Sequence, residues 1–266
     1  MGPTLSILIC TINDRIKDVA GMLLPERPDV CYIVSFQYTD TMFLQMVPAI
    51  LRERPDVEVL PHPSVGLSVN RNAALRACRT ALGLIADDDT RFTDSQIDSV
   101  IRCFNDHPEV DIACFQAIYA DGTPLKDYPT YSFNYRDTPR GYYYCSLEIA
   151  LRTDTELPLF DARFGLGASF LNCGEEEVFL YHASCAGLNI RYFPIVTATT
   201  RQGLTTGARF ATDVRVRRSK GAVLYVIHGL IGGYLRLCKT ALLQPGHRWQ
   251  AYRDMLDGMK YILRTE

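Results

Sequence analysis

Three consecutive carboxylates follow a short apolar run near residue 85 of the chain. Asp87, Asp88 and Asp89 come directly after Leu84-Ile85-Ala86, which is typical of a buried strand. Carboxylates are hard oxygen ligands that suit Mg²⁺ or Mn²⁺, and such ions also bind substrate phosphates. Open α/β sheets bind their ligands at the carboxyl ends of strands. The run therefore predicts a metal-assisted phosphate site, and the simpler alternative is a solvated acidic turn.

A second group of polar residues opens a predicted helix at residues 66–72. The segment combines a turn glycine, a serine, two asparagines and Arg71. The amino terminus of a helix presents unpaired N–H groups and a positive dipole end to an anion. Arg71 can grip phosphate oxygens with two parallel hydrogen bonds. The segment predicts a diphosphate contact, although an ordinary capped helix has the same composition.

A third group places acids after a glycine, in the order Gly174, Glu175, Glu176 and Glu177. A glutamate on the first turn of a helix can act as general base on a substrate hydroxyl. The alternative is that these acids only favour the helix dipole. No Ser-His-Asp or Cys-His spacing can be assigned, and His182 is expected to pack rather than to react.

Alternating strand and helix patterns predict the layered α/β sheet that positions these groups. The apolar runs predict strands at residues 5–10, 30–36, 57–60, 82–86, 112–119 and 190–196. Helical spacing predicts helices at residues 41–54, 67–82 and 94–105, the last with Thr93 as its N-cap. The carboxyl ends of the strands then carry the acids and amides described above.

Two later segments differ in composition from this pattern. Residues 121–144 are rich in tyrosine, and we expect a functional excursion over one face of the sheet. Residues 209–220 are basic, and the apolar segment at 222–243 carries His228, Arg236 and Lys239, which disfavours a transmembrane span. This segment predicts a helix that rests on an anionic membrane or packs on the catalytic domain.

Composition excludes several classes of protein. The 266 residues are 47% hydrophobic and 22% charged, as in ordinary globular proteins. A net charge of -2 gives no reason to expect a nucleic-acid partner. The nine cysteines form no metal-ligand or C-x-x-C spacing, and the first residues lack the pattern of a signal peptide. A cytoplasmic location, or a peripheral one on the cytoplasmic face of the membrane, is therefore expected.

In this order, the motifs resemble those of family-two glycosyltransferases of the GT-A fold, the inverting bacterial enzymes that build capsule and other envelope polysaccharides. The resemblance covers about residues 4–207 and includes the opening strand at 5–13, the arginine helix at 66–72, the DxD region at 86–89 and the acidic motif at 174–176. It implies transfer of a sugar from a nucleotide diphosphate, with UDP as the expected nucleotide, to a hydroxyl of a glycan or lipid-linked saccharide acceptor.

The resemblance also implies a role for individual residues. It assigns the donor side to Thr11, Asn13, Gln37, Arg71, Asp87 and Asp88. Asp89 is expected to hold Mn²⁺ or Mg²⁺, and Glu176 stands at the position of the catalytic base. Gly174, Glu175 and Tyr142 are expected on the acceptor side.

The implied fold is a Rossmann-like α/β domain of GT-A type, with a mixed, mostly parallel sheet flanked by helices. We predict a transferase domain at residues 1–207 and a helical extension at 208–266 that contacts a membrane or a partner. The sequence departs from the family in two places. Gln37 stands near the end of the second strand, where many relatives have an aspartate, and residues 197–201 lack the usual metal-binding histidine.

Two other functions are compatible with parts of this pattern. A catalytically silent sugar-nucleotide-binding subunit would explain the missing histidine, but it would not need both the aspartate run and Glu176. A nucleotidyltransferase of similar fold would carry a glycine-rich basic loop after the first strand, and Thr11-Ile12-Asn13-Asp14-Arg15 does not supply one.

Overall fold

The computed structural model describes residues 2, 4–201, 209–244 and 246–265. The chain divides into two compact units. The first unit consists of Met1–Val65, Val69–Leu159 and His182–Gly203, and the second of Gly66–Ser68, Phe160–Tyr181 and Leu204–Glu266. The predicted domain boundary at residues 207 and 208 lies outside the described residues and stays a prediction.

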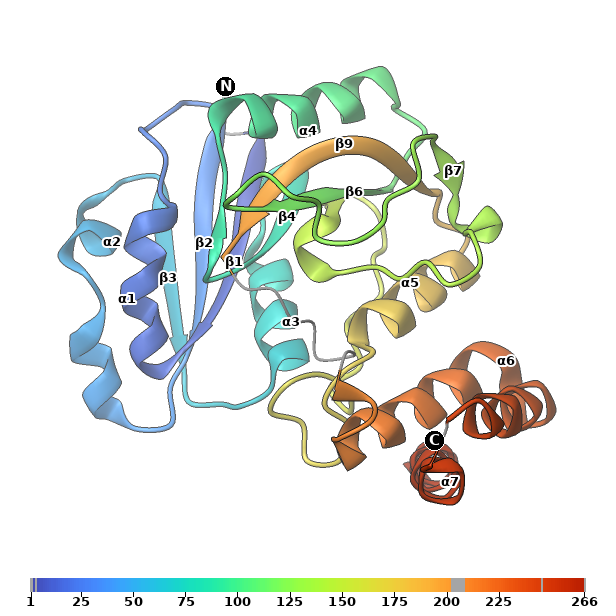
Figure 1. The fold of residues 1–266 in the computed structure, drawn as a ribbon. Helices are drawn as coiled ribbons and strands as arrows, with labels where there is room; N and C mark the ends of the chain where they lie inside the picture. Colours follow the sequence, from blue (N-terminus) through green and yellow to red (C-terminus); the bar gives the residue numbers. More distant parts are fainter. Residues whose placement is uncertain (1, 3, 202–208, 245, 266) are drawn as a thin grey trace. The chain divides into compact units, whose positions relative to one another are not determined.

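The first unit is built on a mixed sheet with the strand order β3-β2-β1-β4-β8-β6-β9-β5, and β7 pairs with β9 (Figure 1). Strands β1 to β4 run parallel, β8 runs antiparallel between β4 and β6, and β6 runs parallel to β9. The bounds are β1 Leu5–Ile12, β2 Val30–Gln37, β3 Val57–His62, β4 Leu82–Asp87, β5 Thr90–Arg91, β6 Ile112–Tyr119, β7 Phe133–Asn134, β8 Ile149–Arg152 and β9 Ile190–Thr200.

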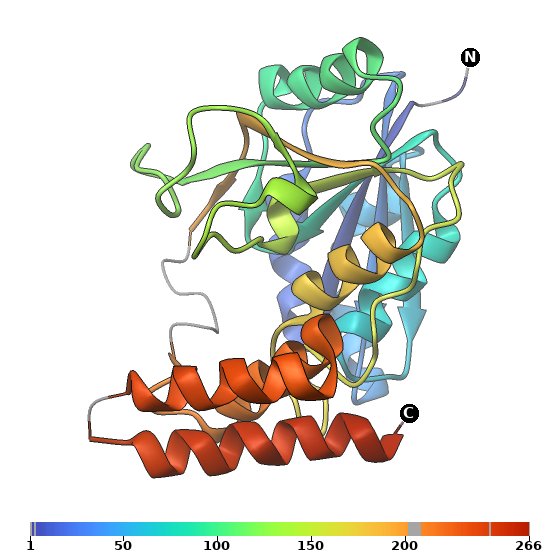
Figure 2. The same ribbon diagram turned by 90° about the vertical axis from the view of Figure 1, so that its right-hand side faces the viewer.

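The second unit contains the helices α6 (Val214–Leu242) and α7 (Arg248–Thr265), which pack side by side (Figure 2). Gly229 interrupts α6 with φ 67° and ψ −175°, a conformation outside the helical region. Among the described helices, α6 is the one whose length and apolar composition would suffice to cross a membrane. The break at Gly229 divides it into two shorter helices.

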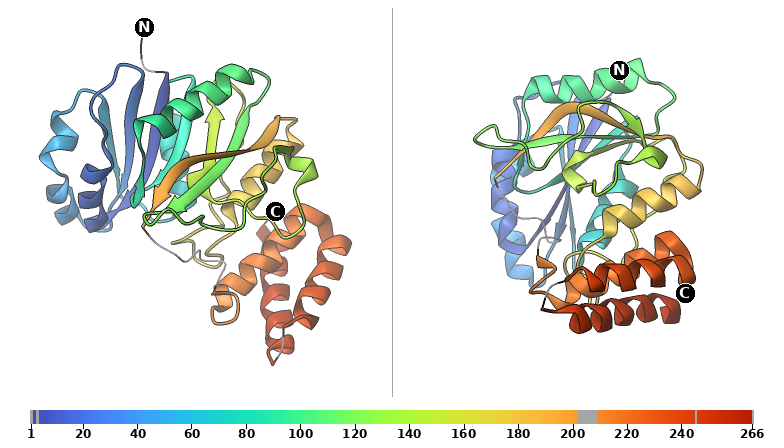
Figure 3. Two further views of the ribbon diagram at one scale, coloured as in Figure 1. Left: turned by 45° about the horizontal axis from the view of Figure 1, so that its top comes forward. Right: turned by 45° about the vertical axis from the view of Figure 1, so that its right-hand side comes forward.

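Helices cover both faces of the sheet in the first unit. The side chains of Ile7 and Ile9 in β1 pack with α1 (Ile16–Val19), α2 (Ala49–Glu53) and α4 (Asp94–Asp106). Leu8, which points to the opposite face, packs with α3 (Leu67–Ala77). Helix α4 lies along β9 (Figure 3). The rings of His107 and Phe193 lie 4.8 Å apart. Because β1 is buried on both faces, its sequence reads as a continuous apolar run.

The predicted strands are all present, and most extend one to four residues beyond their predicted ends. The predicted helix at residues 41–54 is wrong as a single element. It is a 3-10 helix at Thr41–Met46 followed by α2, because Pro48 lacks an N–H group and holds Val47 extended. The predicted helix at 67–82 ends at Ala77, whereas α4 begins after its N-cap Thr93, as predicted. Thr93 and Gln96 also form a complete capping box.

Candidate functional site

The polar residues predicted for the donor side lie at one edge of the sheet. Ile12 at the end of β1 is in register with Gln37 in β2, and Cys10 is in register with Asp87 in β4. The connection after β1 leads to β2 on one side, whereas β4 lies on the other side of β1, so the strand order reverses at β1. Open α/β sheets bind their ligands in the crevice formed at such a point. The structure therefore brings Thr11, Gln37 and the aspartate run to the same end of the sheet.

Asp88 is turned away from solvent and bound to an arginine, Arg15, that lies outside the sequence motifs. The side chain of Asp88 is 4% exposed, and Arg15 donates from Nε to Oδ2 at 2.9 Å and from its Nη2 to Oδ1. Burial raises the pKa of Asp88, and the bond from Arg15 opposes that shift. The charge of the middle carboxylate, Asp88, is thus balanced by Arg15 inside the first unit.

The other two aspartates are more exposed than Asp88. Asp87 receives a hydrogen bond of 3.3 Å from Arg71, whose side chain is 2% exposed, and one of 3.2 Å from the hydroxyl of Ser146. Burial raises the pKa of Asp89, and the charge of Asp87 raises it further. Arg71 and Asp87, which the motifs both assign to the donor side, therefore contact each other in the structure.

Asn13 and Gln37 shape the neighbouring ends of β1 and β2. Asn13 has a φ of 54°, which asparagine tolerates better than most residues, and its side-chain oxygen accepts hydrogen bonds from the backbone and hydroxyl of Thr39. Gln37 is buried and donates from Nε2 to Ser64 at 2.9 Å. His62 lies between Ser35 and Ser64, at 3.0 and 2.8 Å. Burial lowers the pKa of His62, which keeps this polar network neutral.

The carboxylates of this edge suit a divalent ion that shares its coordination with a substrate. In the part of the chain that the structure describes, no three His, Cys, Asp or Glu side chains gather as a metal site. Mg²⁺ is often bound by only one or two carboxylates together with waters and substrate phosphates. Since Asp88 is occupied by Arg15, the carboxylates that fit this role are Asp87 and Asp89.

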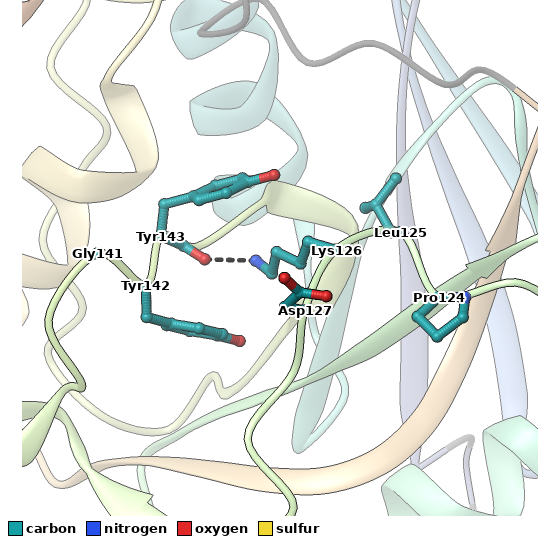
Figure 4. A pocket seen from close by; sticks show the side chains of 7 residues that line it. All are labelled: Pro124, Leu125, Lys126, Asp127, Gly141, Tyr142 and Tyr143. Atoms are coloured by element: carbon teal, nitrogen blue, oxygen red, sulfur yellow. Dashed lines mark hydrogen bonds between the residues drawn. The ribbon is translucent and has the colours of Figure 1, made fainter.

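The tyrosine-rich segment forms a pocket of about 520 Å³ between residues 124–127 and 141–143 (Figure 4). The ammonium group of Lys126 lies between two rings, 4.6 Å from the centre of Tyr142 and 4.3 Å from that of Tyr143. It donates to the backbone carbonyl of Tyr143 and, at 2.8 Å, to the buried carboxylate of Glu148. Tyr143 is 38% exposed and Asp127 is also exposed, so the pocket offers an aromatic surface and a free carboxylate.

The buried carboxylate of Glu148 binds residues on this pocket's wall. It is fully buried and also accepts hydrogen bonds from the Tyr128 hydroxyl at 2.6 Å and from the backbone of Cys145 at 3.1 Å. Burial raises its pKa, and the charge of Lys126 opposes that shift. Neither residue was identified from the sequence, because the pairing joins positions 22 residues apart without a recognisable motif.

The acidic motif lies in the second unit, at the start of α5 (Glu175–Cys185). Gly174 precedes the helix with a φ of 92°, and a Cβ there would lie 2.5 Å from Val223 Cγ2. Gly165 has a φ of 101° and packs against the Glu175 carboxylate and the Ser68 hydroxyl. Glu175 is buried, whereas Glu176 is partly exposed. Gly165 thus allows the Glu175 carboxylate and Ser68 at the start of α3 to approach it closely, and Glu176 is the more accessible of the two acids.

Solved structures with this fold define the class. Residues 1–349 of S. aureus TarS match with a TM-score of 0.60 and 15% identity, over 100% of this chain and 83% of that one. The same region in complex with UDP-GlcNAc matches with a TM-score of 0.61 and 15% identity, over 97% and 82%. Its complex with UDP gives 0.58 and 15%, over 100% and 83%. The first unit, with its mixed sheet and the aspartate run after β4, has the GT-A fold.

A sequence-family model matches the middle part of the chain. The sequence model of Glycosyl transferase family 2 matches residues 38–160, which include the arginine helix, the aspartate run and the tyrosine-rich segment. Over residues 38–160 the chain is similar to family-2 glycosyltransferases, in agreement with the resemblance predicted from its motifs. No curated protein sequence matches the chain.

Proposed function

We propose that the chain is an inverting glycosyltransferase that moves a sugar from a UDP-sugar to a hydroxyl of a glycan or lipid-linked saccharide in envelope polysaccharide synthesis. The main support for this proposal is the aspartate run at the carboxyl end of β4. There Arg15 forms an ion pair with Asp88, and Arg71 forms one with Asp87. The complexes of TarS with UDP-GlcNAc and UDP support a uridine nucleotide as donor.

In the proposed reaction Glu176 accepts the proton of the acceptor hydroxyl. The oxygen attacks the anomeric carbon from the face opposite the nucleotide, so a new C–O bond forms as the bond to the diphosphate breaks and the configuration inverts. Arg71 and the backbone N–H groups at the start of α3 bind the departing diphosphate, whose negative charge grows in the transition state.

A divalent ion, Mn²⁺ or Mg²⁺, completes the proposed donor site. Asp89 would hold it, with Asp87 on the ribose side as a second oxygen ligand. Such an ion neutralises the charge of the leaving diphosphate. The fit of Asp87 and Asp89 to this role rests on the pairing of Asp88 with Arg15, which leaves these two carboxylates to contact the ion.

For the acceptor we propose the pocket at residues 124–127 and 141–143. The exposed ring of Tyr143 offers a flat apolar face, and Asp127 offers a hydrogen-bond acceptor, which together suit a sugar ring. A lipid-linked acceptor would require the chain to work peripherally at a membrane. Replacing Tyr143 with alanine should raise the KM for the acceptor roughly tenfold or more, since an aromatic contact contributes about 1 kcal/mol beyond its buried area. An unchanged KM would exclude this pocket.

Calorimetric titration with UDP, GDP, CDP and dTDP tests the donor proposal. We expect UDP to bind with Mn²⁺ and to bind much more weakly without it. Asp89→Ala should reduce the Mn²⁺-dependent part of the binding, whereas Asp127→Ala, an exposed acid of the other pocket, should not. If none of the four nucleotides binds, the silent-subunit function is favoured instead.

A transfer assay on Glu176→Gln tests the assignment of the base. The variant keeps the size of the side chain but cannot accept the proton, so we expect transfer to fall by about two to four orders of magnitude. UDP affinity should stay close to that of the unmodified protein. Glu177→Gln is the matched control, because Glu177 lies on the same turn and pairs with Lys220 at 3.9 Å. Near-normal transfer by Glu176→Gln would show that another residue is the base.

A further inference from the structure

Large apolar side chains are exposed around the second half of α6 and the beginning of α7. Ile231 is 78% exposed and Trp249 71%, and neither faces the core of the second unit. We call this region the 230–249 surface. Its exposed apolar members are Leu230, Ile231, Tyr234, Leu235, Leu242, Leu243 and Trp249.

The exposure follows from how this part of α6 packs. Gly233, Leu237 and Ala241 form one buried stripe at helical spacing, and Leu237 and Ala241 belong to the same apolar cluster as Met255 of α7. Ile231, Leu235 and Leu242 lie on the other side of the same helix and are left in solvent. A helix in a water-exposed position normally carries charged residues on that side. The 230–249 surface therefore needs a partner to cover it.

The charge on this surface defines the partner. No acidic residue occurs between Asp213 and Asp254, whereas Arg236, Lys239 and Arg248 lie exposed among the apolar side chains. A second copy of the chain, related by a two-fold axis, would bring these cations against one another. An anionic partner with an apolar interior fits both properties, because it attracts the cations and accepts the leucines.

The aromatic residues also fit a lipid surface. Trp249 stacks on Tyr252 with ring centres 5.4 Å apart, and the hydroxyls of Tyr252 and Tyr234 are 3.0 Å apart. Tryptophan and tyrosine have an apolar body and a polar tip, and they concentrate where a bilayer meets water.

We infer that the 230–249 surface docks on an anionic lipid bilayer and lies in its interface without spanning it. The break at Gly229 leaves helices of Val214–His228 and Leu230–Leu242, each shorter than the roughly 20 residues that a span needs. The apolar side chains enter the acyl boundary while Arg236, Lys239 and Arg248 contact the headgroups. The inference deepens the peripheral membrane contact of the proposed function and names the surface and the lipid chemistry.

Sedimentation with lipid vesicles tests this inference in the absence of nucleotide. We expect the full chain to bind vesicles of phosphatidylcholine and phosphatidylglycerol and to bind pure phosphatidylcholine at least about tenfold more weakly. Ile231→Glu combined with Leu235→Glu should abolish binding. Arg236→Glu with Lys239→Glu should lower it by about 25-fold or more, since each cation contributes about fivefold near an anionic surface.

Ile50→Glu is the matched control, because Ile50 is a 43% exposed apolar residue of the first unit. It should leave vesicle binding unchanged, and circular dichroism should show that all variants keep their helices. Equal binding to neutral and anionic vesicles, or full binding by the glutamate variants, would overturn the inference. So would a stable dimer in analytical ultracentrifugation that the glutamate variants lose. UDP binding is measured separately, so failure of the lipid contact is distinguishable from failure of the transferase proposal.

Discussion

Three identical residues in one run have different environments. Asp88 is buried and bound by Arg15, whereas Asp87 and Asp89 keep part of their surface exposed. A buried carboxylate without a cation would be costly, because desolvation disfavours its charged form. The pairing with Arg15 therefore lets Asp88 fix the turn after β4 while its neighbours stay available to a ligand. The division of roles comes from the environment and not from the residue type.

Replacing Arg15 with glutamine should destabilise the protein by about 1–3 kcal/mol, a value reduced because the arginine is 48% exposed. The loss should be largest at neutral pH and should shrink in acid. Burial holds the pKa of Asp88 above its ordinary value, so protonation removes the buried charge as the pH falls through that pKa. Urea unfolding at several pH values measures this effect.

The control for this prediction is the double variant Arg15→Gln with Asp88→Asn. It removes the charge as well as its partner, and it should recover much of the lost stability and lack the pH dependence. If Arg15→Gln alone unfolds at the same urea concentration as the unmodified protein, the pair does not stabilise the turn.

The sequence indicates the aspartates but not their arginine. Asp87 to Asp89 could be located because a buried strand precedes them and strand ends carry ligand sites. Arg15 is 73 residues away from Asp88, and no local pattern distinguishes it from other exposed arginines. Their pairing follows from the neighbouring positions of β1 and β4 in the sheet, which is long-range information.

Among the elements, those with a strong local pattern were predicted and those defined by their neighbours were not. The central strands have continuous apolar runs because both of their faces are buried. Strand β8 was missed because only Ile149, Ala150 and Leu151 form its apolar run, and its pairing between β4 and β6 determines it. The helix at residues 41–54 was wrong because the apolar spacing continues across Pro48 while the backbone does not.

Two glycines allow the first half of α6 to cross α7 at close range. A Cβ on Gly221 would lie 1.8 Å from the carbonyl oxygen of Met255, and one on Gly258 would lie 1.8 Å from that of Arg218. No side chain can yield at either point, because the neighbouring atoms belong to the backbone. The same crossing contains the buried ion pair of Arg217 and Asp254, at 2.7 Å.

Gly258→Ala should therefore destabilise the protein by about 1–3 kcal/mol or more, although alanine is the better helix former. Gly232→Ala is the matched control in α6, since the nearest atoms to its Cβ are the Cβ of His228 at 3.3 Å and the Arg236 side chain at 3.6 Å. It should change stability by less than about 1 kcal/mol. Thermal unfolding followed by circular dichroism compares the two, and equal midpoints would show that the helices can separate at no cost.

At the scale of the whole molecule, charge is distributed unevenly along the chain. Residues 209–266 contain 11 lysines and arginines against 4 acids, a formal charge of +7, so residues 1–208 carry −9 of the total of −2. A net charge near zero thus conceals a basic part that an anionic surface attracts and an acidic part that it repels. The acids of the second part include Asp254, which is buried and paired.

This distribution predicts that nucleotide and lipid act on different segments, which hydrogen exchange can locate. UDP with Mn²⁺ should slow exchange at residues 11–15 and 87–91, where the donor edge lies, and leave residues 230–249 unchanged. Anionic vesicles should slow exchange at residues 230–249 and leave residues 11–15 and 87–91 unchanged. High salt should remove this effect of the vesicles, because it screens the attraction between exposed charges. Protection of residues 87–91 by vesicles alone would mean that lipid reaches the donor edge, and it would contradict the assignment of membrane contact to the basic part of the chain.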